Sequence, residues 1–172
     1  FTDDELLSIF ELSEGNWFSF LSSSNRYSKE KLEGDIENLE SFYLDRGYLK
    51  YSLESIQVSV SQDKENVFIS MSILEGEKYT VDKVNIIGDI PLSESVYEPI
   101  LDTLKGQTYS QAQITQIEDY FTNLLGNEGY TFAEVRGNPE IKDDDELVDL
   151  LFIVQPGNRT YARKINFSGN HL

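Results

Sequence analysis

The sequence predicts an α+β fold made of two tandem copies of one unit, each with the order β-α-α-β-β. Two features carry this prediction: short motifs that recur at a fixed offset, and a helical apolar stripe followed by residues that alternate as in a strand. The motif pairs are Tyr27-Ser28 with Tyr109-Ser110 (109 − 27 = 82), Gly47-Tyr48 with Gly129-Tyr130 (129 − 47 = 82), and Lys83-Val84-Asn85-Ile86 with Lys164-Ile165-Asn166-Phe167 (164 − 83 = 81). A chain built of copied units is more often a scaffold than a single catalytic pocket.

Two helices are predicted in the first unit. Thr2-Asp3-Asp4-Glu5 has the pattern of a capping box, which predicts a helix from Asp3 to about Leu12. Ser28 is a candidate N-cap for a second helix that runs to Arg46, and Gly47 follows where a left-handed residue commonly ends a helix. Apolar side chains at i, i+4, i+7 and i+11 give this helix one buried stripe: Leu32, Ile36, Leu39 and Tyr43.

Two strands should follow these helices. Apolar residues at every second position predict a half-buried strand, and they are Val67, Ile69, Met71 and Ile73. The preceding strand is expected over Leu49 to Val60, but its apolar residues change from odd to even positions. Because a shift of one residue turns every side chain to the other face, this change predicts a β-bulge near Glu54-Ser55. The hairpin turn is expected at Gln62 to Asn66.

The second copy is more complete. A strand is expected from Tyr79 to Ile87, and a helix from near Ser93 in which Pro99 either occupies the first turn or causes a kink. Ser110 should open another helix that Gly129 ends, followed by strands at about Thr131–Val135 and Glu146–Val154. The inner stripe of that helix consists of Ile114, Ile117, Phe121 and Leu124.

The ends of the chain complement each other. The first unit begins at its helix and lacks a leading strand, whereas Thr160 to Phe167 has the pattern of a leading strand without helices after it. We therefore expect a piece of a longer array, with domains at 1–77 and 78–157 and the start of a further domain at 158–172. Phe1-Thr2-Asp3-Asp4 has no basic region and no apolar stretch, so it is not a signal peptide.

Composition excludes several classes of function. The chain has no Cys, so disulfides, thiolate chemistry and sulfur-ligated metals are excluded. Its 31 acidic and 14 basic residues give a net charge of −17, which repels phosphate backbones and argues against nucleic-acid binding. No apolar run is long enough to span a membrane. An apolar content of 39% is ample for globular folding.

No residues support an enzyme, a metal site or a cofactor site. His171 is the lone imidazole, which leaves no catalytic triad and no histidine metal cluster. Asp143-Asp144-Asp145-Glu146 resembles a calcium loop only in charge, because it lacks the alternating ligands and the central Gly, and a solvated hairpin turn is favoured. An acidic hydrolase would need a cleft that holds a carboxyl group with a raised pKa.

The order of these motifs resembles that of POTRA (polypeptide-transport-associated) domains. The resemblance rests on the β-α-α-β-β unit, the helix end Tyr43-Leu44-Asp45-Arg46-Gly47-Tyr48, the hairpin exit Leu74-Glu75-Gly76, and Val84-Asn85-Ile86-Ile87-Gly88-Asp89. It covers essentially the whole chain and is closest to the third and fourth domains of arrays that assemble outer-membrane β-barrels, with Ile165 to Asn170 opening the fifth. It implies a three-stranded mixed sheet covered by two antiparallel helices in each unit, the first unit lacking its leading strand.

The resemblance also implies a function and a surface. POTRA arrays form the periplasmic portion of a bacterial outer-membrane protein, receive unfolded outer-membrane proteins and dock accessory lipoproteins, of which BamB is associated with the third domain. Contact with the membrane would be made by a C-terminal barrel that is not in this sequence. The partner-binding surface would be the edge strand of the first unit, with Glu54, Ile56, Gln57, Val58, Ser59 and Val60. An edge strand offers unpaired N–H and C=O groups to a strand added by β-augmentation.

Other interpretations remain open at this point. The edge could be protected by its own bulge, by Lys50 and by Glu54, without any partner. The units could instead form a rigid spacer and hinge, with Gly76–Tyr79 and Gly157–Thr160 setting its reach. The strand Thr160–Phe167 could also fill the empty leading-strand position of another copy, head to tail.

Overall fold

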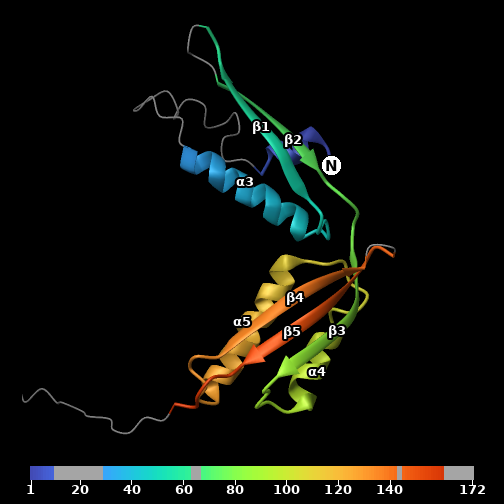
Figure 1. The fold of residues 1–172 in the computed structure, drawn as a ribbon, viewed down its shortest axis with the longest axis vertical. Helices are drawn as coiled ribbons and strands as arrows, with labels where there is room; N and C mark the ends of the chain where they lie inside the picture. The colour runs from blue at the N-terminus through green and yellow to red at the C-terminus, as the bar shows by residue number, and fades with distance from the viewer. Residues whose placement is uncertain (10–28, 63–66, 143–144, 161–172) are drawn as a thin grey trace, which may run out of the picture. The chain divides into compact units, whose positions relative to one another are not determined.

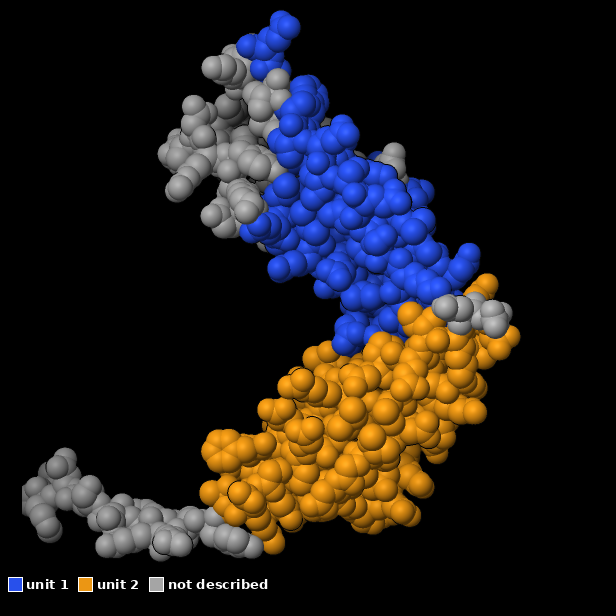
Figure 2. All heavy atoms as spheres, viewed as in Figure 1, with its two compact units in different colours: residues 1–80, 108–111 blue, residues 81–107, 112–172 orange. Residues whose placement is uncertain are grey.

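The computed structural model describes residues 1–9, 29–62, 67–142 and 145–160. The chain divides into two compact units (Figure 2). Unit 1 comprises Phe1–Thr80 with Thr108–Gln111, and unit 2 comprises Val81–Gln107 with Ala112–Leu172. No helix within the described ranges combines the length and the apolar character that crossing a membrane requires.

Unit 1 opens with α1 (Asp3–Leu7), and its predicted capping box is confirmed. The Thr2 hydroxyl accepts the Glu5 N–H at 3.3 Å, and the Glu5 carboxylate accepts the Thr2 N–H at 2.9 Å. The hydrogen bonds that the Thr2 N–H and the Thr2 hydroxyl donate to the Glu5 carboxylate lower the pKa of Glu5. The helix ends at Leu7 instead of near Leu12, and residues 10–28 lie outside the described residues.

The long helix of unit 1 is α3 (Lys29–Leu44), within the predicted bounds. Leu32, Leu39 and Tyr43 are buried, which confirms the apolar stripe, while Ile36 is partly exposed. Gly47 has a φ of +94°, as expected of the residue that ends the helix. The candidate cap Ser28 lies outside the described residues.

The sheet of unit 1 is a hairpin of β1 (Ser52–Val60) and β2 (Val67–Leu74). The register shifts between Leu53 and Ser55, so the predicted bulge is confirmed. The strand begins at Ser52 and not at Leu49, because the chain first turns after Gly47: the Tyr51 N–H bonds to the Tyr48 carbonyl at 3.1 Å.

Unit 2 contains a three-stranded sheet of β3 (Thr80–Gly88), β4 (Glu134–Lys142) and β5 (Leu147–Gln155), in the order β3-β5-β4. In Figure 1 the arrows of β3 and β5 point the same way, and β4 is antiparallel to β5. The sheet is therefore mixed, as predicted. Gly88 ends β3 so close to β5 that a Cβ there would lie 2.1 Å from the Val154 carbonyl oxygen.

The core of unit 2 lies between this sheet and the helices α4 (Glu94–Asp102) and α5 (Gln111–Asn127). Alternate residues of β5 are buried: Val148, Leu150, Phe152 and Val154. The ring of Phe121 in α5 meets the Phe152 ring edge-on at 6.4 Å. Pro99 lies in the sixth position of α4, so the first-turn alternative for this proline is wrong.

The prediction of a strand at Thr131–Val135 is wrong in its bounds, and this is the largest difference between prediction and structure. The structure places β4 at Glu134–Lys142, after a turn in which the Ala133 N–H bonds to the Tyr130 carbonyl. Gly137 and Pro139 interrupt the sequence pattern, yet both fit an edge strand. The acidic turn at 143–144 and most of the segment Thr160–Phe167 lie outside the described residues.

Candidate strand-addition surface

The six residues predicted to bind a partner all lie on β1. Among the described residues, β1 pairs with β2 on one side and with no strand on the other. Glu54, Gln57 and Ser59 are exposed, Ile56 is half-buried, and Val58 is 46% exposed. The side chain of Val60 lies outside the described residues.

The bulge puts Glu54 out of the ladder at the start of β1. Leu53 pairs with Ile73 and Ser55 with Ser72, so Glu54 has no partner residue across the strand. Its carboxylate instead accepts a hydrogen bond from the Ser72 hydroxyl at 3.2 Å. Beyond the bulge, Ile56 and Val58 share a face with Met71 and Ile69, respectively, which keeps one face of the hairpin apolar.

Strand β4 of unit 2 shows which residues of an edge strand point their N–H groups away from the sheet. Gly137 lies opposite Phe152 in the β4–β5 ladder, and its N–H donates to the Glu118 carboxylate at 2.6 Å, so this N–H points away from β5. Pro139, two residues on, has no N–H, and proline is tolerated in a strand where that group would point outward. Along β4, the odd-numbered residues from Val135 to Ile141 therefore present their backbone groups to the outside.

The same rule applies to β1. The two hairpins can be aligned at their exits, which are Leu74-Glu75-Gly76 in unit 1 and Gln155-Pro156-Gly157 in unit 2. In this alignment Met71 corresponds to Phe152, and Ile69 corresponds to Leu150. Ile56 lies opposite Met71 and Val58 opposite Ile69, so they correspond to Gly137 and Pro139. The N–H and C=O groups of Ile56 and Val58 therefore point away from β2.

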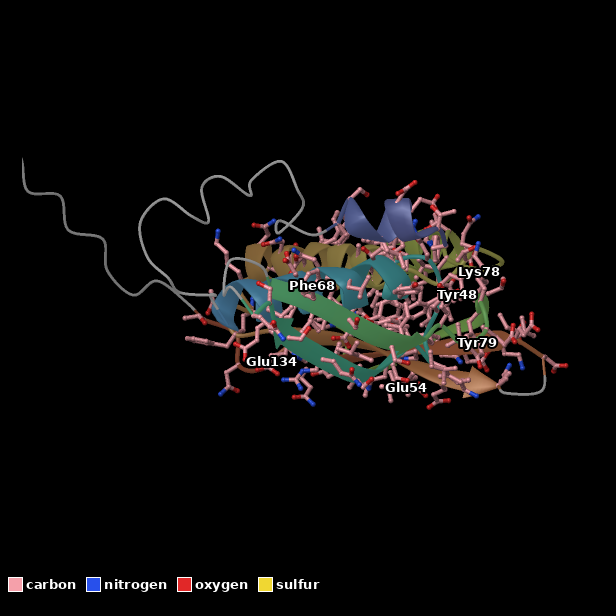
Figure 3. All side chains as sticks on the ribbon, turned by 90° about the horizontal axis from the view of Figure 1, so that it is seen from above. Tyr48, Glu54, Phe68, Lys78, Tyr79 and Glu134 are labelled. Atoms are coloured by element: carbon pink, nitrogen blue, oxygen red, sulfur yellow. The ribbon has the colours of Figure 1, made fainter. Side chains whose placement is uncertain are left out.

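An aromatic cluster fixes the hairpin to the end of α3. The Tyr43 ring stacks on the Tyr51 ring at 4.4 Å, and the Tyr43 hydroxyl donates to the Glu75 carboxylate at 2.6 Å. Burial and this hydrogen bond raise the pKa of Tyr43. Figure 3 shows Tyr48 and Tyr79 at one end of unit 1 and Phe68 toward the other. The two strands are thus held at their Tyr48 end, where β1 begins and β2 leaves.

A charged cluster spans the sheet of unit 2. The Lys142 ammonium donates to the Asp82 and Asp149 carboxylates, both at 2.8 Å, and Asp149 also accepts the Lys83 N–H at 3.0 Å. The hydrogen bond from Lys142 lowers the pKa of Asp149, and those to Asp149 and Asp82 raise the pKa of Lys142. One lysine therefore connects all three strands.

Sequence reasoning missed the Glu118–Gly137, Tyr43–Glu75 and Lys142 contacts. Each joins residues from different elements, and no local spacing marks such a pair. Within the described ranges no group of His, Cys, Asp or Glu is arranged to hold a metal ion. Among the carboxyl groups in the described part of the chain, Glu5 and Asp149 have shifted pKa values, and hydrogen bonds lower both, whereas a hydrolytic acid would need a raised pKa.

A family model and two sequence relatives each match nearly the whole chain. The family model POTRA, described as surface antigen variable number repeat, matches residues 1–76 and 79–157. The outer membrane protein assembly factor BamA of Neisseria meningitidis is 27% identical over 99% of this chain and 22% of its own length. BamA of Buchnera aphidicola is 28% identical over 100% of this chain and 28% of its own length. This chain thus spans about a quarter of these relatives.

A solved structure shares the fold over nearly the whole chain. The crystal structure of Haemophilus influenzae BamA POTRA3-5 has a TM-score of 0.78 at 24% identity, over 99% of this chain and 67% of that one. The family match covers both units, and the mixed sheet of unit 2 agrees with the predicted architecture. The chain therefore belongs to the POTRA family, as a tandem pair of its domains.

Proposed function

We propose that this chain is a non-catalytic periplasmic scaffold of the machinery that assembles outer-membrane β-barrels. Its relatives are named as outer membrane protein assembly factors, and the likeness to BamA POTRA3-5 supports a correspondence of unit 1 to the third and unit 2 to the fourth domain. In this role β1 accepts a strand from an unfolded outer-membrane protein or from an accessory lipoprotein, BamB foremost.

The observation that carries the proposal is the outer edge of β1. The backbone groups of Ile56 and Val58 point away from β2, and the described residues include no strand on that side. A row of such groups is a template for another strand. The bulge at Glu54 marks one end of this row, because it interrupts the regular ladder there.

This kind of recognition suits a carrier of many clients. Backbone hydrogen bonds supply the affinity in strand addition, so the client sequence can vary widely. Side chains contribute through alternate positions, and the exposed Val58 offers apolar area to such a client residue. Strands of outer-membrane barrels alternate apolar and polar residues, which fits an edge with one apolar and one polar face.

A proline at position 58 tests the proposal. Val58→Pro removes one outward N–H and leaves the β1–β2 ladder intact, because that group does not point toward β2. The matched control, Val58→Thr, keeps the N–H and a β-branched side chain. We expect Val58→Pro to weaken binding of a fluorescein-labelled barrel-strand peptide by about tenfold, since an outward donor is lost and a proline ring obstructs the edge. Val58→Thr should bind within about twofold of the unchanged chain.

Equal peptide affinity for the proline and threonine variants would contradict strand addition at β1. No detectable peptide binding by any of these chains would favour a second function, a spacer between neighbouring modules. That function is supported by Gly76 and Gly157, which occupy corresponding positions after β2 and β5 and have φ values of +74° and +67°. The spacer predicts several inter-domain angles in solution scattering and no peptide binding.

A further inference from the structure

Strand β4 is the counterpart of β1 in unit 2, but the two outer edges differ in the hydrogen-bond donors that they offer. Glu118 in α5 reaches the edge and accepts the outward N–H of Gly137 at 2.6 Å. A strand added at β4 would have to use this same donor. It would also bring a carbonyl oxygen close to the carboxylate oxygen that already accepts this N–H, and two acceptors at one donor repel each other.

Pro139 removes the next donor of the same row. It lies two residues beyond Gly137 and opposite Leu150, so it belongs to the outward-facing set. Proline has no N–H, and such residues protect natural sheet edges from unwanted pairing. Of the four odd-numbered positions from Val135 to Ile141, the two in the middle therefore offer no free donor.

The contact between Glu118 and the β4 edge depends on the glycine at position 137. A Cβ there would lie 2.6 Å from the Ile114 side chain and 2.9 Å from the Phe152 ring. The absence of a side chain lets α5 lie close to β4, and this closeness brings the Glu118 carboxylate to the backbone. The contact is thus built by three elements that pack together, and not by a surface side chain that happens to lie nearby.

At the two corresponding positions of unit 1, both of which are described, neither the carboxylate nor the proline is present. At the helix offset of 82, Glu118 corresponds to Ile36 (118 − 82 = 36), which has no polar atom in its side chain. Through the cross-strand partners, Pro139 corresponds to Val58 and Gly137 to Ile56. The same fold therefore occurs twice in one chain, once with the two blocking residues and once without them.

We propose that Glu118 and Pro139 close the edge of β4 to strand addition, so that an incoming strand is directed to β1. The occupant excluded is an extended peptide of alternating apolar and polar residues. The direction to β1 rests on the function proposed above, whereas the closure of β4 stands on the unit 2 contacts alone. A scaffold that handles unfolded chains gains from this arrangement, because a client would otherwise be held at two edges at once.

The geometry is tested first without a ligand, by amide hydrogen exchange at Gly137. We expect this amide to be protected in the unchanged chain and to exchange at least about tenfold faster in Glu118→Ile, because its acceptor is lost. Glu118→Gln should retain the protection, since its amide oxygen still accepts. Rapid exchange of Gly137 in the unchanged chain would overturn the proposal.

The closure is then tested by grafting the unit 1 residues into unit 2, as Glu118→Ile with Pro139→Val. The chain has no Cys, so a single cysteine placed at Asn138 or at the corresponding Gln57 reports where a strand lies. The probe is a peptide of about ten residues with alternating valine and threonine and one cysteine. Disulfide yield is measured at equilibrium in a glutathione buffer, with circular dichroism and thermal unfolding to confirm that each variant is folded.

We expect little disulfide at position 138 in the otherwise unchanged chain and a yield at least about tenfold higher after the double substitution, because two donors become available. Glu118→Gln alone should leave the yield low. All position 138 measurements are repeated with Val58→Pro, which removes competition from β1. A folded double variant that still gives no disulfide at 138 would overturn the closure of β4, and so would a yield at 138 that is as high before the double substitution as after it.

The two proposals fail differently. If β1 takes no strand, the yield at position 57 is low and insensitive to Val58→Pro, while the gain at position 138 is still expected. If β4 is not closed, the yield at 138 is high from the start, whatever happens at 57.

Discussion

Gly47 shows how a single residue sets the geometry of unit 1. Its φ of +94° ends α3, its N–H bonds to the Leu44 carbonyl and its carbonyl accepts the Tyr79 N–H at 2.9 Å. A Cβ at this position would lie 2.8 Å from the Thr108 methyl group. The motif Gly-Tyr was visible in the sequence as a helix stop, but the close approach of Thr108 was not, because Thr108 lies far along the chain.

Substitution of this glycine is therefore expected to be costly. We predict that Gly47→Ala lowers the free energy of unfolding of unit 1 by about 1–3 kcal/mol, through backbone strain and the clash with Thr108. Gly34→Ala is the matched control, because nothing lies within 4 Å of a Cβ placed there in α3. It should stabilise the unit by about 0.5–1 kcal/mol. Chemical denaturation of both variants measures the difference, and equal effects would contradict the account.

Asp149 gives unit 2 a defined response to acid. The hydrogen bond from Lys142 lowers its pKa from the ordinary value of 3.8, so the folded state favours the ionised carboxylate. The resulting stabilisation is complete above that value and is lost as the pH falls through the lowered pKa. We predict that Asp149→Asn destabilises unit 2 at neutral pH and that the difference from the unchanged chain shrinks as the pH falls below about 4.

Glu134→Gln is the control for this titration. Glu134 forms an ion pair with Arg136 at 3.1 Å, but the two side chains are 61% and 74% exposed, so the pair should contribute little. Thermal unfolding between neutral and acidic pH compares the variants. A difference that stays constant down to acidic pH would show that the titration of Asp149 does not affect folding.

At the scale of elements, the hairpin of unit 1 shows which structural features the pattern of apolar residues can predict. The change of parity along β1 predicted the bulge, because apolar side chains must return to one face after an inserted residue. The same reasoning failed for β4, where Gly137 and Pro139 replace the expected apolar residues. Both residues are explained by an edge position next to α5, and an edge position is a property of the assembled sheet.

The bulge can be tested by removing it. Deleting Glu54 restores uninterrupted alternation, with Leu53, Ile56 and Val58 still on one face. We therefore predict a folded unit 1 with a melting temperature within a few degrees of the unchanged chain. Deleting Gln57 instead turns Val58 to the polar face and should unfold the hairpin. Circular dichroism and thermal unfolding separate the two deletions, and similar losses in both would contradict the assigned register.

At the scale of the whole chain, repetition was the strongest sequence signal. It predicted two units of one design, and the family match covers both. It could not predict how the copies differ, because Ile36 and Glu118 each suit a helix when considered alone. The difference becomes visible only once Glu118 is seen to bond Gly137. The functional distinction between the units therefore depends on contacts between elements, and not on the shared motifs.

The central claim is that a client strand adds to the outer edge of β1, and amide hydrogen exchange with and without a barrel-strand peptide tests it most directly. Strand addition protects only amides that point outward, so protection must alternate along the strand. We predict that the peptide slows exchange at Ile56 and Val58 and leaves Gln57 and Ser59 unchanged, because these already bond to β2. Peptide binding that leaves Ile56 and Val58 unprotected would contradict the account.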